Sequence, residues 1–342
     1  MCSITKCHSR ARLKFRPMAV YWVPNYLAAS TLFFRLLRPL STLAYRDLYG
    51  SPPPPIKNCF RQPWYRLNSI TIRGITWLNK IFLLIAVCSR TTEFEERKVI
   101  RQTWGSLAVN NTEIRLVFML GYRPETNYLD LKTESEKYHD IIQEDFYDSY
   151  RNLSIKSEAI LRFASTFCQG VKYILKVDND VFINLPFLIE ELREHDGRNM
   201  IMGYAFIPLM SLLPSRNPKS KGHVEGITYP LPYYPQYAHG PAYVLSGDIT
   251  RKLLSVALRT KYYSLEDVFI NGIVRERAGV KLIYHRISYY CGPFVDICWF
   301  ENRVSGHHYT KEQIIEIWSQ KNQNKLCTLP LRMFYTLCGY FI

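Results

Sequence analysis

The chain of 342 residues lacks several patterns that would assign it to a common class of protein. Its nine cysteines occur singly, and no two of them form a CxxC pair, which argues against a structural zinc site. Zinc-finger spacing and a basic helical run are also missing, so the formal net charge of +15 does not by itself predict nucleic-acid binding. A basic protein that handles anionic nucleotides is the milder explanation of this charge.

A full-length apolar membrane span is missing as well. The uncharged stretch from Met18 to Phe34 has 17 residues, against roughly 20 that cross a bilayer, and it contains Pro24 and Asn25. Before it stand basic residues without an acidic one, namely Lys6, Arg10, Arg12, Lys14 and Arg16. This charge order is typical of a type II signal anchor, although a cleaved leader or a mis-predicted first exon is an alternative.

The N-terminal pattern predicts a division of the chain into four parts. We expect a cytosolic tail over residues 1–17, an anchor over 18–34, a Pro-rich stem over 35–75 that includes the SPPPP run, and a lumenal catalytic domain over 76–342. Single cysteines suit disulfides in an oxidising compartment. The glycosylation sequons at Asn110-Asn111-Thr112 and Asn152-Leu153-Ser154 support this topology without proving it.

The most informative stretch is KYILKVDNDVFIN, residues 172–184. Its apolar first half predicts a buried strand that stops at Asp178, Asn179 and Asp180. Ligands collect outside the carboxyl ends of strands in open α/β sheets, and carboxylates there suit Mn²⁺ or Mg²⁺. Taken alone, the tripeptide favours a solvated turn, and only its context on either side favours a site.

The rest of the chain alternates between predicted strands and helices. We expect strands at Ile81 to Val87 and Ile114 to Leu120, and a helix near Tyr128 to Tyr138. A Thr92/Glu95 capping box should open a helix that Gly105 closes. Such alternation predicts an α/β fold with a mostly parallel sheet covered on both faces.

Several polar and aromatic groups are candidates for a site. Arg97 and Arg101 share one helix face, where they could grip a diphosphate or form salt bridges with Glu93 or Glu96. Glu266 and Asp267 open a further helix, where an acid can also serve only the helix dipole. Pro208 to Pro235 should form a long loop over the site, followed by tyrosines that could stack on a sugar or simply pack, namely Tyr233, Tyr234, Tyr237 and Tyr243.

Six blocks taken together resemble the β-1,3-galactosyltransferase family, which also contains β-1,3-N-acetylglucosaminyltransferases. The blocks occur in family order over most of residues 80–320 and read RKVIRQTW (97–104), VFMLG (117–121), HDIIQEDFYDSYRNLSIK (139–156), KVDNDVFIN (176–184), YPQYAHGPAYVLS (234–246) and LEDVFING (265–272). The resemblance implies a GT-A type glycosyltransferase fold with a mostly parallel central sheet flanked by helices. It also implies a Golgi membrane enzyme of type II, inverting and metal-dependent, that uses a UDP-sugar.

The resemblance also implies roles for individual residues. Asp178, Asp180 and His307 would hold Mn²⁺ or Mg²⁺, with Asp180 favoured as the direct ligand. Asp267 would be the catalytic base, with Glu266 as its neighbour.

Other residues fall in the donor-binding region by the same resemblance. These are Arg97, Arg101 and Gly121 together with Asp178, Asn179 and Asp180. The family commonly has three Asp residues where this chain has Asn179 in the middle, which puts the positioning of the donor ribose and sugar in doubt.

Three functions are compatible with these residues. The first is transfer of galactose from UDP-galactose, in β-1,3 linkage, to a GlcNAc- or GalNAc-terminated glycan of a glycoprotein or glycolipid. The second is the same reaction with UDP-GlcNAc or UDP-GalNAc. The third is a silent glycan-binding protein, against which Asp267 argues because a binder needs no base. We expect the UDP-sugar, the glycan acceptor and the membrane as partners, and no nucleic acid.

Overall fold

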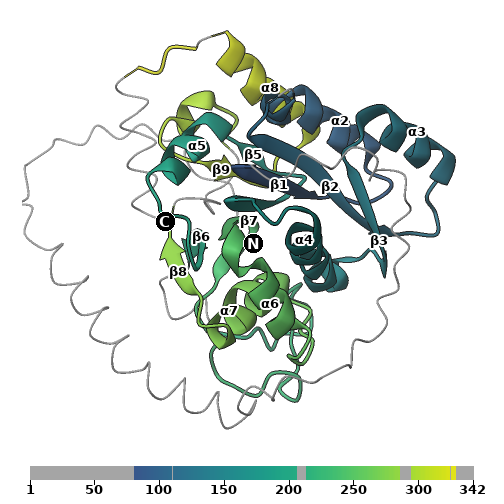
Figure 1. Ribbon diagram of the computed structural model, residues 1–342, viewed down its shortest axis with the longest axis vertical. Coiled ribbons are helices and arrows are strands. Elements are labelled where there is room, and N and C mark those ends of the chain that lie inside the picture. The colour runs from purple at the N-terminus through teal and green to yellow at the C-terminus, as the bar shows by residue number, and fades with distance from the viewer. Residues whose placement is uncertain (1–80, 110, 206–212, 286–293, 324, 329–342) are drawn as a thin grey trace, which may run out of the picture. The chain divides into compact units, whose positions relative to one another are not determined.

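The computed structural model describes residues 81–109, 111–205, 213–285, 294–323 and 325–328 (Figure 1). All of them belong to one compact unit, Lys57–Ile342. The expected cytosolic tail, anchor and most of the stem lie outside the described residues. None of the helices in the described part of the chain is long and apolar enough to cross a membrane.

A seven-stranded sheet forms the centre of the unit. In order across the sheet, its strands are β3 (Ile141–Tyr147), β2 (Ile114–Tyr122), β1 (Leu83–Cys88), β4 (Tyr173–Asp178), β7 (Ala238–Ser246), β6 (Met200–Ala205) and β8 (Lys281–Tyr284). Strand β7 is antiparallel to both of its neighbours, while every other pairing in this sheet is parallel. The start of β7 therefore lies at the edge where the parallel strands end.

Helices cover both faces of the sheet, as Figure 1 shows. They are α2 (Phe94–Gln102), α3 (Tyr128–Tyr138), α4 (Leu153–Phe167), α5 (Leu185–Arg193), α6 (Thr250–Ala257), α7 (Arg275–Arg277) and α8 (Lys311–Asn322), with 3₁₀ turns at Trp104–Ala108, Tyr150–Asn152, Gly247–Ile249 and Ile297–Phe300 and a π-helix at Asp267–Val274. On one face, alternate residues of β1 share a core with α2, α5 and α8. On the other face lie α4, α6 and the π-helix. The predicted α/β fold, with a mostly parallel central sheet flanked by helices, is therefore confirmed.

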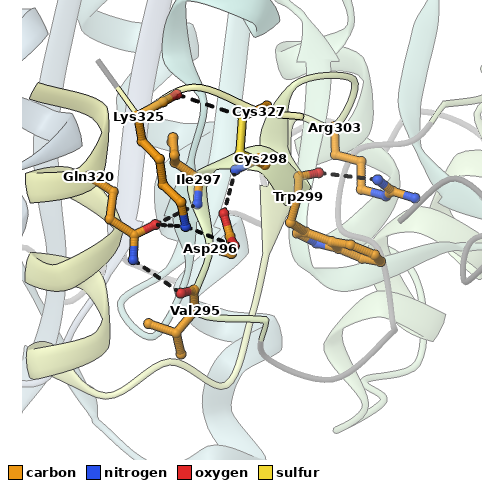
Figure 2. The surroundings of a disulfide bond; sticks show 9 residues. All are labelled: Val295, Asp296, Ile297, Cys298, Trp299, Arg303, Gln320, Lys325 and Cys327. Atoms are coloured by element: carbon orange, nitrogen blue, oxygen red, sulfur yellow. Dashed lines mark hydrogen bonds and ion pairs between the residues drawn. A yellow bond between two sulfur atoms is a disulfide. The ribbon is translucent and has the colours of Figure 1, made fainter. Parts of the chain in front are cut away.

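A second sheet of two short strands follows the central one. Strand β5 (Phe182–Ile183) pairs antiparallel with β9 (Ser305–Gly306). Next to β9, the only disulfide among the described residues joins Cys298 to Cys327 (Figure 2). Lys325 adds an ion pair to Asp296 at 2.9 Å, so the segment after α8 is fixed to the turn before β9.

Two details of the predicted helices are wrong. The helix expected to open at a Thr92/Glu95 capping box begins at Phe94, with Glu93 as its N-cap and no side-chain capping bond, and it ends at Gln102, before Gly105. The segment that begins at Asp267 is a π-helix rather than an α-helix over its first eight residues. By contrast, α3 has the bounds that its sequence predicted.

Candidate active site

A cavity of about 360 Å³ lies at the edge of the sheet where β1 and β4 end and β7 begins. Its walls come from segments that are far apart in the sequence. They are the end of β1 with the loop after it, the segment from Asp148 to Lys156, the turn after β4, the start of β7, the start of the π-helix, the segment after β9, and Lys221 of the connection between β6 and β7. Six of the predicted site residues line it together, namely Asp178, Asn179, Asp180, Glu266, Asp267 and His307.

The turn after β4 presents two carboxylates to this cavity. Asp178 accepts a hydrogen bond from Lys176 Nζ at 2.6 Å. Burial raises the pKa of Asp180, and the negative charge of Asp178 raises it further, while His308 has the opposite effect. The carboxylates of Asp178 and Asp180 thus repel each other at the end of β4.

The short β5–β9 ladder brings the histidines to this turn. The amide of Tyr309 donates to the carbonyl of Asp180 at 3.0 Å, and Nδ1 of His308 lies 3.5 Å from Oδ2 of Asp180. The buried ring of His307 packs against His308 and against His239 of β7, with centroid distances of 4.2 and 5.1 Å. Residues separated by more than a hundred positions therefore converge through the two residue pairs of this ladder, Phe182 with Gly306 and Ile183 with Ser305.

These residues fit a divalent cation by their chemistry. Carboxylate oxygens suit Mn²⁺ and Mg²⁺, and an imidazole suits the softer Mn²⁺. A bound cation would also relieve the repulsion between Asp178 and Asp180. The described residues do not, however, contain a preassembled group of three or more His, Cys, Asp or Glu side chains able to hold a metal ion.

Glu266 and Asp267 have different surroundings although they are neighbours. Glu266 is buried, and its Oε1 accepts hydrogen bonds from the hydroxyls of Ser157 and Tyr243, each at 2.6 Å. Asp267 lies against Gly240 of β7, where an added Cβ would meet its carboxylate at 3.4 Å. Burial, with the charge of Glu266 as a second cause, raises the pKa of Asp267 to about 6. Asp267 thus lines the cavity with a raised pKa, whereas Oε1 of Glu266 already accepts two hydrogen bonds.

A buried lysine joins the two acidic groups. Lys176 Nζ lies 2.6 Å from Asp178, 2.7 Å from the carbonyl of Gly240 and 3.7 Å from Glu266. Burial favours the neutral amine, but the charges of Asp178 and Glu266 outweigh this and raise the pKa of Lys176. The ammonium group therefore stays charged and links the turn after β4 to the start of the π-helix. The sequence pattern did not single out this residue.

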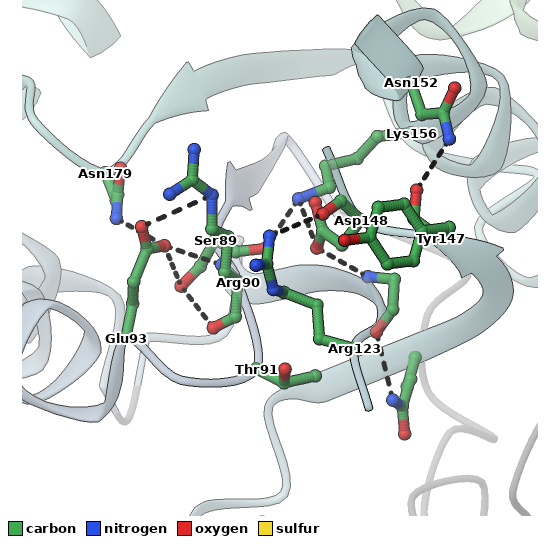
Figure 3. Close-up of polar contacts among 12 residues, drawn as sticks. Ser89, Arg90, Thr91, Glu93, Arg123, Tyr147, Asp148, Asn152, Lys156 and Asn179 are labelled. Atoms are coloured by element: carbon green, nitrogen blue, oxygen red, sulfur yellow. Dashed lines mark hydrogen bonds and ion pairs between the residues drawn. The ribbon is translucent and has the colours of Figure 1, made fainter. Parts of the chain in front are cut away.

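A second buried lysine supports the opposite wall. Lys156 of α4 pairs with Asp148 at 2.8 Å and donates to the carbonyl of Ser89 at 2.6 Å (Figure 3). Asp148 in turn accepts a hydrogen bond from the amide of Gly121 at 2.9 Å. Gly121, predicted in the donor-binding region, therefore contacts a residue of the cavity wall without lining the cavity itself.

Arg97 and Arg101 are not part of the cavity lining. Both pair with Glu134 of α3, at 2.6 and 2.7 Å, and Arg101 also pairs with Asp140 at 2.8 Å. Arg97 is fully buried and donates to Ser89 Oγ and to the carbonyls of Arg90 and Thr91. Their ion-pair partners are therefore Glu134 and Asp140 rather than Glu93 or Glu96, and Arg97 reaches the cavity only through the loop after β1.

The arginine that does line the cavity is Arg90, which sequence reasoning missed. It lies two residues after the end of β1, and a basic residue just beyond a predicted strand was the signal that could have identified it.

The predicted sugar-stacking tyrosines are mostly packed inside the protein. Tyr234, Tyr237 and Tyr243 are buried, and Tyr234 shares a 2.6 Å hydrogen bond with Tyr263. None of the four lines the cavity. Of the two alternatives, packing therefore holds for these three: Tyr234 and Tyr237 belong to an aromatic cluster with Tyr229 and Tyr263, and the hydroxyl of Tyr243 donates to Glu266.

Comparison with known proteins identifies the family of this chain. A family model described as galactosyltransferase matches residues 95–286, which include the Asp178–Asp180 turn and the Glu266–Asp267 pair. The chain belongs to the galactosyltransferase family. It is 31% identical over 260 residues to beta-1,3-galactosyltransferase 2 of Homo sapiens, covering 71% of this chain and 59% of that protein. It is also 31% identical over 252 residues to beta-1,3-galactosyltransferase 1 of Mus musculus, covering 71% of this chain and 75% of that protein.

The family resemblance predicted from the sequence blocks is therefore confirmed. The matched part of the chain corresponds to somewhat less than two thirds of the length of beta-1,3-galactosyltransferase 2. Among solved structures, a bifunctional glycosyltransferase, WbbM, aligns with 75% of this chain at 11% identity and a TM-score of 0.43.

Proposed function

We propose that this member of the galactosyltransferase family is an inverting, GT-A type hexosyltransferase that moves galactose from UDP-galactose, in β-1,3 linkage, to a GlcNAc- or GalNAc-terminated glycan. The observation that carries the proposal is the pairing, in one cavity, of the Asp178–Asp180 turn with the accessible, basic carboxylate of Asp267. The names of the relatives support galactose as the transferred sugar.

Asp267 is the base of the proposed reaction. It takes the proton of the acceptor hydroxyl as that oxygen forms a bond to the anomeric carbon, and the bond from this carbon to the diphosphate oxygen breaks. A single displacement inverts the anomeric centre, and UDP carries the leaving electron pair. With a pKa of about 6, Asp267 is ionised at neutral pH and is a stronger base than an ordinary aspartate.

The other charged groups position the donor. Asp178, Asp180 and His307 would hold Mn²⁺ or Mg²⁺, which supplies positive charge at the departing diphosphate. Lys176 contacts both Asp178 and Glu266, and it thereby fixes the distance between the turn after β4 and the start of the π-helix. Arg97, Arg101 and Gly121 belong to the donor-binding region through the loops that they support.

The proposed setting is the Golgi lumen. Residues 18–34 would anchor the protein as a single-pass type II membrane protein, with the catalytic unit on the lumenal side. The Cys298–Cys327 disulfide supports an oxidising compartment. The proposed partners are the UDP-sugar, a glycan acceptor on a glycoprotein or glycolipid, and the membrane.

Hydrolysis of UDP-sugars by the purified lumenal unit tests the donor. UDP-galactose should be turned over faster than UDP-GlcNAc and UDP-GalNAc, and a chelator should abolish turnover until Mn²⁺ is restored. Preference for UDP-GlcNAc or UDP-GalNAc would favour the second function, whereas glycan binding without turnover of any donor would favour the silent protein. Asp180→Ala should lose the wild-type dependence on Mn²⁺ concentration, and an unchanged dependence would contradict the ligand assignment.

A further inference from the structure

The loop between β1 and α2 is fastened to the acidic turn by one side-chain contact. Asn179 Nδ2 donates to Glu93 Oε2 at 2.8 Å, across 86 positions of sequence (Figure 3). The same oxygen accepts from the amide of Arg90 at 2.6 Å and from Ser89 Oγ at 3.3 Å. The Glu93 carboxylate at the end of the loop thus binds the start of the loop, at Ser89 and Arg90, and the middle residue of the turn, Asn179.

This contact requires an amide at position 179. An aspartate there would set a carboxylate within hydrogen-bond distance of the Glu93 carboxylate, and two like charges at that separation repel. Glu93 supplies a third carboxylate to the cavity beside Asp178 and Asp180, and the amide of Asn179 binds it without adding a fourth negative charge.

The loop held in this way carries Arg90. Its Nε lies 3.9 Å from Glu93 Oε1, and its side chain is 49% exposed and lines the cavity. The buried side chain of Arg97 binds the same loop by donating to Ser89 Oγ and to the carbonyl of Thr91, each at 3.2 Å. The loop is therefore fixed at two points, and Arg90 is the only basic residue of the Ser89–Glu93 loop that lines the cavity.

We propose that the Asn179–Glu93 bond is a latch that holds the Ser89–Glu93 loop against the Asp178–Asp180 turn and so presents Arg90 to the diphosphate of the nucleotide donor. A guanidinium group can bind two phosphate oxygens at once, so Arg90 could hold the β-phosphate that UDP has and UMP lacks. Asn179 and Glu93 are positioning residues, and Arg90 is the binding residue. The inference rests on the proposed use of a UDP-sugar.

Calorimetric titration with UDP, in the presence of Mn²⁺, tests the latch. Asn179→Asp should weaken UDP binding about tenfold, and most of this loss should disappear in the Glu93→Gln background, because the repulsion is then removed. Glu95→Gln is the matched control: Glu95 lies in the first turn of the same helix but pairs with Lys98. In that background Asn179→Asp should keep its full effect.

Arg90→Gln tests the binding residue. It should weaken the binding of UDP about tenfold and that of UMP much less, with an unchanged melting temperature. Equal losses for UDP and UMP, or none, would overturn the role of Arg90. If Asn179→Asp costs the same affinity in the wild-type and Glu93→Gln backgrounds, the latch is overturned. Failure of the wild-type protein to bind any UDP would instead overturn the proposed function, and this inference with it.

Discussion

At the scale of single residues, the neighbouring carboxylates of Glu266 and Asp267 differ in their hydrogen-bond partners. Glu266 accepts hydrogen bonds from Ser157 and Tyr243 and forms an ion pair with Lys176, whereas Asp267 faces the cavity with a pKa of about 6. A carboxylate that is already saturated with donors is a poor proton acceptor. The structure thus supports a division in which Glu266 organises the buried network and Asp267 carries the chemistry.

Replacing Asp267 by Asn should reduce turnover by about 10² to 10⁴, because the variant cannot accept the acceptor's proton. UDP affinity should change little. In the wild type, kcat/KM should fall as the pH drops through about 6. The comparison is steady-state turnover and UDP titration of Asp267→Asn against Glu266→Gln. A dead Glu266→Gln beside an active Asp267→Asn would reverse the two roles.

The same substitution should make the protein more stable at neutral pH. A carboxyl whose pKa is higher in the folded state than in the unfolded chain binds its proton more tightly when folded. Its contribution to stability is therefore present below about pH 4 and is lost as the pH rises through about 6. Asp267→Asn should raise the melting temperature by about 2 to 6 °C at pH 7.5 and by nothing near pH 4. Equal gains at both pH values would show that the charge of Asp267 is not the cause.

At the scale of elements, strand pairing assembles the site from distant segments. Strand β4 ends at the acidic turn, and the β5–β9 ladder immediately after it returns the His307–His308 segment to the same place. The Cys298–Cys327 disulfide encloses β9, both histidines and α8 in one loop. This covalent link is therefore part of the support of the predicted metal ligand His307.

Loss of the disulfide should affect both stability and metal affinity. In Cys298→Ser combined with Cys327→Ser, the melting temperature should fall by about 5 to 10 °C, because the unfolded chain is no longer constrained over a loop of this length. The Mn²⁺ concentration needed for half-maximal turnover should rise at a temperature where the variant is still folded. A matched substitution of the buried free thiol, Cys168→Ser, should leave the Mn²⁺ requirement unchanged. An unchanged requirement in the double variant would separate the disulfide from the metal site.

Sequence reasoning predicted the elements better than their buried polar contacts. Strands β1, β2 and β4 were predicted because their apolar runs are clear, whereas β3, β5, β6, β8 and β9 were not predicted. Asp178, Asp180 and Asp267 stood out because they end a strand or begin a helix. Lys176 was not recognised, because a strand buried on both faces shows no alternation that marks where one charged residue points. The π-helix was also hidden, since over eight residues its apolar spacing differs little from that of an α-helix.

At the scale of the whole molecule, the positive charge is unevenly distributed. Residues 1–80 contain 13 of the 44 Lys and Arg residues but one of the 29 Asp and Glu residues. The remaining 31 basic and 28 acidic residues nearly balance. The net charge of +15 is therefore mainly a property of the N-terminal segment, and nucleotide binding in the catalytic unit depends on a few placed cations rather than on a general positive field.

The two sequons should behave differently in protein made by secretory cells. Asn152 Nδ2 donates to the carbonyl of Tyr147 at 2.7 Å, and the buried hydroxyl of Ser154 donates to the carbonyl of Tyr263 at 2.6 Å. A glycan on Asn152 would remove the first of these contacts beside the cavity. Endoglycosidase should therefore shift the wild type and Asn152→Gln equally, and Asn110→Gln should abolish the shift. A smaller shift in Asn152→Gln would contradict this prediction, and no shift in the wild type would weaken the lumenal topology.

The reversed direction of β7 has a consequence for how the family can diversify. The parallel strands contribute to the cavity only the segments that follow them, but β7 contributes the segment that precedes it. The connection from β6 to β7 adds Lys221 to the cavity wall, where its ammonium group lies over the ring of Tyr150. This connection can change in length and composition without moving β1 or β4, which end at the proposed donor side. Grafting residues 206–237 between relatives should therefore exchange the range of accepted glycans while the nucleotide requirement stays with the recipient.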